Sequence, residues 1–176
     1  MIEGPTAEER AAHFGPGGPV EAARSWLEDI LQRADLRSAW SKTDPDFRLA
    51  LTQAIIFLNE QSPLLEGQER EQLAHALAED HPDHPLWDVF AELLTQEFLN
   101  DLGEIRVEHR KEATPRPIAP GYELVLFPHA LIAEPASDPP EMRAHGVLVH
   151  YRDGVWLVAG LSERRAIPGW PPDLGY

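Results

Sequence analysis

The chain has 176 residues, 43% of them hydrophobic, which suffices for one sizeable core but not for two ordinary domains without a clear linker. Thirty acidic against fifteen basic residues give a formal net charge of -15, which disfavours nucleic acid and anionic membranes as partners. There is no cysteine, which excludes disulfide and thiolate chemistry. No stretch approaches the roughly 18 apolar residues of a membrane-spanning helix. We therefore expect a cytoplasmic protein, and the preference for Arg over Lys suits a GC-rich bacterial genome.

Residues 1–17 are polar and end in glycines, so we expect a flexible lead. Pro19 is well suited to begin a helix, and apolar residues recur at helical spacing as far as Ala34. Asp35 is predicted to cap a short second helix, and Asp44 to cap a longer one that starts at Pro45. The apolar face of that longer helix is expected to carry Leu49, Leu51, Ala54, Ile55 and Leu58.

A more polar helix is predicted over residues 69–79. The HPDHP segment then separates this helix from the next one, and Asp83 is available as the cap of that next helix. This last helix, which ends at Gly103, has the strongest apolar stripe of the sequence. The stripe consists of Leu86, Val89, Phe90, Leu93, Leu94 and Phe98.

From Glu104 onward the pattern indicates strands. Residues 105–109 alternate, residues 122–127 are rich in β-formers, and residues 131–134 are expected to form a brief third strand. The segment TPRPIAPG between the first two is predicted to be a proline-rich turn, and EPASDPPE to be a loop. We therefore expect an α+β chain with helices first and an antiparallel sheet after them.

The last two strands are predicted to form a hairpin around Asp153-Gly154. A two-residue turn pairs Arg152 with Val155 and, further along, Leu148 with Ala159. One face then carries Tyr151, Trp156, Val149 and Val158, and the other Leu148, His150, Leu157, Ala159 and Leu161. Both faces are apolar, so each needs a cover. Helices cover one; a partner subunit, or a tail that folds back with Ile167, Pro168, Trp170 and Pro171, would cover the other.

The segments AARSWLEDILQRADLRSAWSKTDPDF and AHGVLVHYRDGVWLVAGL resemble the nuclear transport factor 2-like superfamily, which includes polyketide cyclases and ketosteroid isomerases. The resemblance includes the closing-strand pattern of Asp153, Gly154, Val155 and Trp156. It implies a cone in which N-terminal helices pack into one face of a curved antiparallel sheet and leave a pocket. Residues 18–162 would form this domain and residues 163–176 a tail. Residues 44–102 are almost continuously helical, unlike the family, so an enlarged helical variant is expected.

Three residues are candidates for acid-base chemistry. His150 lies mid-strand on an apolar face, where it is either a general base in a pocket or a core histidine with a hydrogen-bond partner. His129 and Tyr122 flank the preceding strand and are either at a cavity mouth or at ordinary strand ends. No nucleophile elbow accompanies them.

A ligand pocket is expected to be lined by Trp26, Trp40, Phe90, Tyr122 and His150. Core packing is the first explanation for the tryptophans. A dimer interface on the sheet is expected to use Val149, Tyr151, Trp156, Val158 and Trp170.

His81 and His84 have a spacing that suits a metal, yet two prolines and Asp83 make a solvated interhelical loop the better interpretation. No metal or other cofactor is predicted. Three functions remain open. The first is a non-catalytic accessory module that binds a small apolar ligand or a protein and forms a homodimer through its sheet. The second is an isomerase, cyclase or dehydratase with a histidine base. The third is an acidic inhibitor or immunity-type protein for a basic partner.

Overall fold

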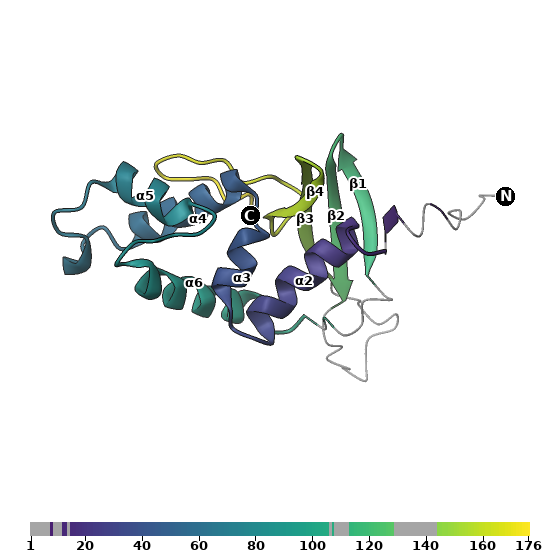
Figure 1. Cartoon of the computed structure of the whole chain (residues 1–176), viewed down its shortest axis with the longest axis horizontal. Coiled ribbons are helices and arrows are strands. Elements are labelled where there is room, and N and C mark those ends of the chain that lie inside the picture. Colours follow the sequence, from purple (N-terminus) through teal and green to yellow (C-terminus); the bar gives the residue numbers. More distant parts are fainter. Residues whose placement is uncertain (1–7, 9–11, 14, 106, 108–112, 129–143) are drawn as a thin grey trace, which may run out of the picture.

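The computed structural model describes residues 8, 12–13, 15–105, 107, 113–128 and 144–176. Helices occupy the N-terminal half and strands the C-terminal half, which confirms the predicted α+β class (Figure 1). The helical elements are α2 (Pro19–Leu31), α3 (Leu36–Ser41), α4 (Pro45–Leu58), the 3-10 turn η1 (Pro63–Leu65), α5 (Arg70–Ala78) and α6 (Trp87–Leu102). The strands are β1 (Thr114–Ala119), β2 (Tyr122–Pro128), β3 (Ala144–Arg152) and β4 (Val155–Gly160).

Within the described residues the strands form one antiparallel sheet in the order β1-β2-β3-β4. Helix α2 packs across one face of this sheet, while α4, α5 and α6 extend beyond its β4 edge (Figure 1). The segment before α4 lies along that edge, where Thr43 forms a parallel bridge with Val158. The sheet is thereby joined to the helical half through backbone hydrogen bonds. In the described part of the chain, no helix has both the length and the apolar character needed to cross a membrane.

The predicted caps of the early helices are confirmed. The Asp35 side chain accepts from the Ser38 amide at the start of α3, and the Asp44 side chain accepts from the Asp46 amide at the start of α4. The prediction for α6 is wrong, because Leu86 occupies the N-cap position and Asp83 lies outside the helix. Instead, Nδ1 of His84 accepts a hydrogen bond from the Leu86 amide.

The proline-rich turn predicted at TPRPIAPG is wrong, since most of this segment is strand β1. Pro115 and Pro117 fit there because β1 is an edge strand and pairs only with β2 among the described strands. The register slips between Pro117 and Ala119. The strand predicted at 131–134, the loop at 134–141 and most of 105–109 lie outside the described residues.

The hairpin turns at Asp153 and Gly154 as predicted, and the pairs from Arg152–Val155 to Val149–Val158 have the predicted register. The next pair is wrong, because a bulge opposes Leu148 to Gly160 rather than to Ala159. The bulge also moves Leu161 from the predicted outer face into the main core with the helices.

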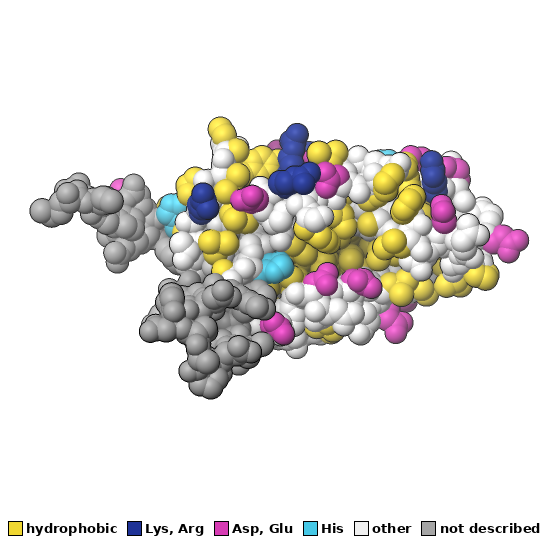
Figure 2. All heavy atoms as spheres, turned by 180° about the vertical axis from the view of Figure 1, so that it is seen from behind, with side chains coloured by type: hydrophobic (Ala, Val, Ile, Leu, Met, Phe, Trp, Pro, Cys, Tyr) yellow, Lys and Arg dark blue, Asp and Glu magenta, His cyan; other side chains and the backbone are white. Residues whose placement is uncertain are grey.

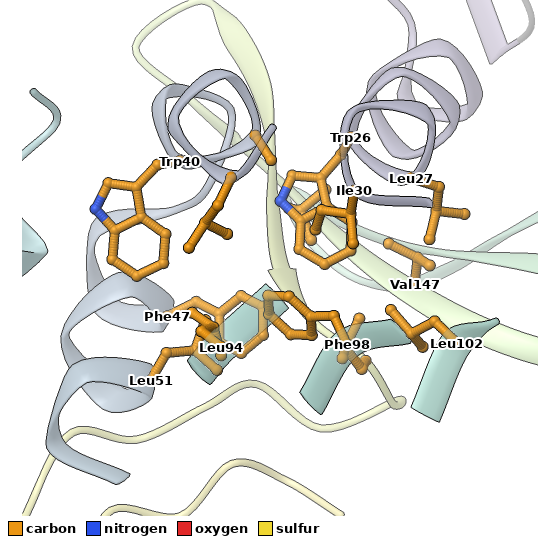
Figure 3. Packing of buried hydrophobic residues seen from close by; sticks show 14 of the residues in the cluster. Trp26, Leu27, Ile30, Trp40, Phe47, Leu51, Leu94, Phe98, Leu102 and Val147 are labelled. Atoms are coloured by element: carbon orange, nitrogen blue, oxygen red, sulfur yellow. The ribbon is translucent and has the colours of Figure 1, made fainter. Parts of the chain in front are cut away.

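The main core lies between the helices and the inner face of the sheet (Figure 3). Trp26 and Leu27 of α2 meet Phe98 and Leu102 of α6, and Val147 of β3 lies beside them. The rings of Trp26 and Phe98 are 5.2 Å apart and close to perpendicular, a favourable edge-to-face contact. Large side chains therefore occupy the region where the resemblance predicts a pocket.

The predicted apolar face of α4 is wrong in part. Of the residues expected to be buried, Leu51 is 2% exposed but Leu58 is 77% exposed. Phe47, Ala50 and Ile56 are buried in their place. Helix α4 contacts α5, α6 and β4, so tertiary packing on several sides decides which of its residues are buried.

Residues 163–176 return along the helical half rather than across the sheet (Figure 1). The Gly169 amide donates to Oε1 of Gln53 at 2.8 Å, and Nε1 of Trp170 donates to Glu71. The guanidinium of Arg70 lies 4.7 Å from the centre of the Trp170 ring, a cation-π contact. Around Gly169 and Trp170 the tail is thus packed against α4 and α5, and its first residues, Glu163 and Arg165, only border the outer sheet face.

Candidate functional site

His150 faces away from the core helices and binds Asp44. Nδ1 of His150 lies 2.9 Å from Oδ2 of Asp44, whose residue is 3% exposed. Because a carboxylate only accepts hydrogen bonds, Nδ1 of His150 carries the hydrogen in this pair. The other Asp44 oxygen accepts from the Asp46 amide at 3.0 Å. One buried carboxylate therefore caps α4 and orients His150.

Tyr122 stacks on the ring of His150. The β2–β3 register places Tyr122 opposite His150, and their rings are parallel within 2° with centroids 4.1 Å apart. The structure thus brings together two of the three predicted acid-base candidates. His129, the third, lies outside the described residues.

Two arginines adjoin the carboxylate of Asp44. Nη1 of Arg152 lies 3.7 Å from Oδ2 of Asp44. Arg48 bonds to Asp80 and to the Trp40 carbonyl through Nη1, and its buried Nε has no acceptor among the described residues. Burial lowers the pKa of Arg48 from its ordinary value, while the charges of Asp80 and Asp44 oppose that change. These contacts describe a charge network at the junction of sheet and helices.

A shallow hollow of about 210 Å³ opens beside Tyr122 on the outer sheet face. Its walls are Ile118, Ala119 and Leu148, with Glu163 and Arg165 at one side. His150 is not among the described residues that line it. The hollow therefore offers an apolar surface next to a tyrosine ring, without direct access to the imidazole.

The other predicted pocket residues do not join this site. Trp26 and Trp40 are each 1% exposed, and their indole N–H groups donate to Thr43 Oγ1 at 2.9 Å and to the Leu77 carbonyl at 3.1 Å. Both are satisfied core residues. Phe90 is also buried, and it lines a different cavity in the helical half.

The predicted interface residues are likewise separated. Val149 and Val158 are fully buried against the helices. Tyr151 is 50% exposed and packs on the partly buried Trp156 at the end of the hairpin. With Trp170 held on α5, Tyr151 and Trp156 are the predicted interface residues that remain together on the accessible part of the sheet.

The two histidines of the interhelical loop have separate surroundings. Nε2 of the exposed His81 lies 3.7 Å from Asp80, and Nδ1 of His84 is engaged by the Leu86 amide. In the described ranges no three metal-ligating side chains gather at one point.

A second surface, which the sequence patterns do not single out, lies at the far end of the helical half. We call it the apolar groove; its walls include Ile55 of α4, Leu64 and Leu65 of η1, and Val89, Phe90 and Leu93 of α6. It encloses about 60 Å³, room for an apolar side chain of a partner. Leu64, Val89 and Leu93 are 55%, 40% and 42% exposed.

The apolar surface continues beyond the groove. Leu58 lies three residues after Ile55, hence on the same side of α4, and is 77% exposed. Of the ten large hydrophobic side chains exposed in the described chain, five fall within residues 57–93. Figure 2 shows hydrophobic side chains over the helical half with carboxylates at its edge. Such a concentration of exposed apolar surface is typical of an interaction site.

The same part of the chain carries most of the negative charge. Residues 49–105 contain twelve Asp and Glu but only one basic residue, Arg70. Their net charge is therefore -11, compared with -15 for the whole chain. Residues 106–176, in contrast, are nearly balanced, with nine acidic and eight basic residues. The apolar groove therefore lies in a strongly electronegative half of the molecule.

Comparisons of the chain with protein family models, with curated proteins and with solved structures found no match. The resemblance to the nuclear transport factor 2-like superfamily stays a prediction.

Proposed function

We propose that this chain is a protein-interaction module that binds a basic partner through the apolar groove. The observation that carries the proposal is the coincidence of an exposed apolar surface with the acidic half of the chain. Apolar contact supplies affinity, while charge complementarity steers association and selects the partner. The proposal unites the accessory-module and basic-partner interpretations of the sequence and moves the binding surface from the sheet to the helices.

The test is capture from cells that produce the chain naturally, with tagged wild-type and variant proteins compared by mass spectrometry. The test variant is the double substitution Val89→Ser and Leu93→Ser, which removes two exposed groove side chains. Val155→Ser is the matched control, because Val155 is 52% exposed on the hairpin, away from the groove.

We expect the wild type and the control to capture a basic protein that the double variant loses and that rising salt releases. An identical set of captured proteins for all three chains, or no specific protein with the wild type, would contradict the proposal.

A second candidate function is binding of a small apolar molecule at the outer sheet face, with His150 and Tyr122 close by. The specific observation in its favour is the Asp44–His150–Tyr122 arrangement beside the hollow. Native mass spectrometry tests it: a small organic adduct on the wild type should be lost with Tyr122→Ala. A bare wild-type mass, or an adduct that survives the substitution, counts against this candidate.

A further inference from the structure

The walls of the apolar groove are built mainly from helix ridges. Val89 and Leu93 are four residues apart and form an exposed ridge on α6, with the buried Phe90 at its base. Ile55 and Leu58 form a similar row on α4. Rows of this spacing are the surfaces into which the side chains of another helix interdigitate.

The groove offers little to pair with an unfolded backbone. Its polar lining residues are Asn59 and Ser62. Nδ2 of Asn59 already donates to the Ile55 carbonyl at 2.8 Å, and Oγ of Ser62 accepts from the Leu64 amide at 3.3 Å. An extended segment in the groove would bury amide and carbonyl groups without partners, whereas a helix satisfies its own. The chemistry of the walls therefore favours a helical occupant.

Carboxylates stand beside the apolar walls on the same elements. Glu92 and Glu97 follow Val89 and Leu93 at helical spacing on α6, and Glu60 lies just after α4; all three are exposed. In a dimer through this groove, two helical regions with a net charge of -11 each would face one another. Their repulsion disfavours self-association at this surface. Lys and Arg flanking the apolar face of the occupant would instead be attracted.

From these features we infer that the apolar groove takes an amphipathic α-helix of the partner, with an apolar stripe at helical spacing and Lys or Arg along its sides. The inference rests on the proposed function and adds the conformation of the bound segment.

The test uses two labelled synthetic peptides with the same Leu and Lys content, each roughly five helical turns long if folded. In the first, Leu recurs at i, i+3, i+4 and i+7; in the second, Leu and Lys alternate, which favours a strand. A Leu/Glu peptide of the helical pattern reports on charge. Fluorescence anisotropy at physiological ionic strength gives the dissociation constants for the wild type, for the Val89→Ser/Leu93→Ser double variant and for Val155→Ser.

We expect the helical Leu/Lys peptide to bind the wild type at least about tenfold tighter than its alternating isomer. The double variant should lose that advantage, Val155→Ser should keep it, and the Leu/Glu peptide should not bind. Equal affinity for the two Leu/Lys isomers would mean attraction by charge alone and would overturn the helical occupant.

The two proposals fail in different ways. If a basic protein is captured in a groove-dependent manner while the peptide isomers bind equally, only the helical occupant is wrong. If capture finds no groove-dependent partner, the proposed function is wrong as well. A dimer in native mass spectrometry that the double variant dissociates would assign the groove to a second copy of this chain and overturn both.

Discussion

Asp44 links the two halves of the molecule through one side chain. It caps α4 with one oxygen and accepts from His150 of β3 with the other, while its own amide donates to the Val158 carbonyl at 2.8 Å. The N-cap role is visible in the local sequence, because Asp-Pro before an apolar run is a helix-start signal. The contact with His150 spans 106 positions, and no local pattern indicates it.

This double role predicts the cost of removing the carboxylate. Asp44→Ala should lower the free energy of unfolding by roughly 2 to 4 kcal/mol, because a helix cap and a buried hydrogen bond to a charged group are both lost. Asp35→Ala, which removes the exposed cap of α3, should cost only about 1 kcal/mol. Urea denaturation of both variants measures the difference. Equal losses would show that the bond to His150 contributes nothing to stability.

Glu69 gives a prediction about pH at the start of α5. Its carboxylate accepts from the amides of Gln72 and Glu71 at 2.8 and 3.2 Å, and these bonds, the first above all, lower its pKa from the ordinary value of 4.5. A carboxyl group whose pKa is lowered in the folded state stabilises the fold at pH values above its ordinary pKa. This stabilisation is lost as the pH falls through the lowered pKa. The stability difference between wild type and Glu69→Gln, followed by urea denaturation, should therefore shrink as the pH falls below 4.5. A difference that stays constant down to full protonation would contradict this account of the cap.

At the scale of elements, the sequence predicts well those features that depend on neighbours in the chain. The start of α2 at Pro19, the cap of α3 and the Asp153-Gly154 turn are of this kind. Strand β1 is not, because prolines are compatible with a strand only at a sheet edge, and the edge is a property of the whole sheet. The bulge at Leu148 is a similar case, since strand pairing beyond a turn is decided by packing on both faces.

The apolar groove shows the same limit on α6. The predicted stripe contains both Phe90, which is 3% exposed, and Val89 and Leu93, which are about two-fifths exposed. Periodicity identifies the apolar residues of a helix but does not say whether the chain itself covers all of them. The stripe on α6 has more apolar residues than a single core contact needs. This excess is the feature of the sequence that points to an exposed apolar surface.

Two kinds of substitution on α6 distinguish core from groove. Phe90→Ala should destabilise the fold by about 3–5 kcal/mol, because it leaves a cavity between α3 and α6. Val89→Ser and Leu93→Ser should each cost less than about 1 kcal/mol, since their side chains are already half in solvent. Thermal and urea unfolding measure both. A cost of several kcal/mol for either serine variant would place that residue in the core and remove it from the binding surface.

At the scale of the whole molecule, negative charge is concentrated in the helical half and nearly balanced in the strand half. The helical stretch 49–105 has a balance of -11, and the strand half is almost neutral. The net charge of -15 alone is compatible with a general solubility role. Its concentration around an uncovered apolar surface is the feature that favours a basic partner, and it emerges only once the fold shows where the surface lies.

The most direct measurement is amide hydrogen exchange of the chain with and without its captured basic partner. The account predicts protection at the end of α4, in η1 and in the first half of α6, with β3 and β4 unchanged. Protection concentrated at Tyr151, Trp156 and the hairpin, with the apolar groove unaffected, would contradict it and return the binding surface to the sheet.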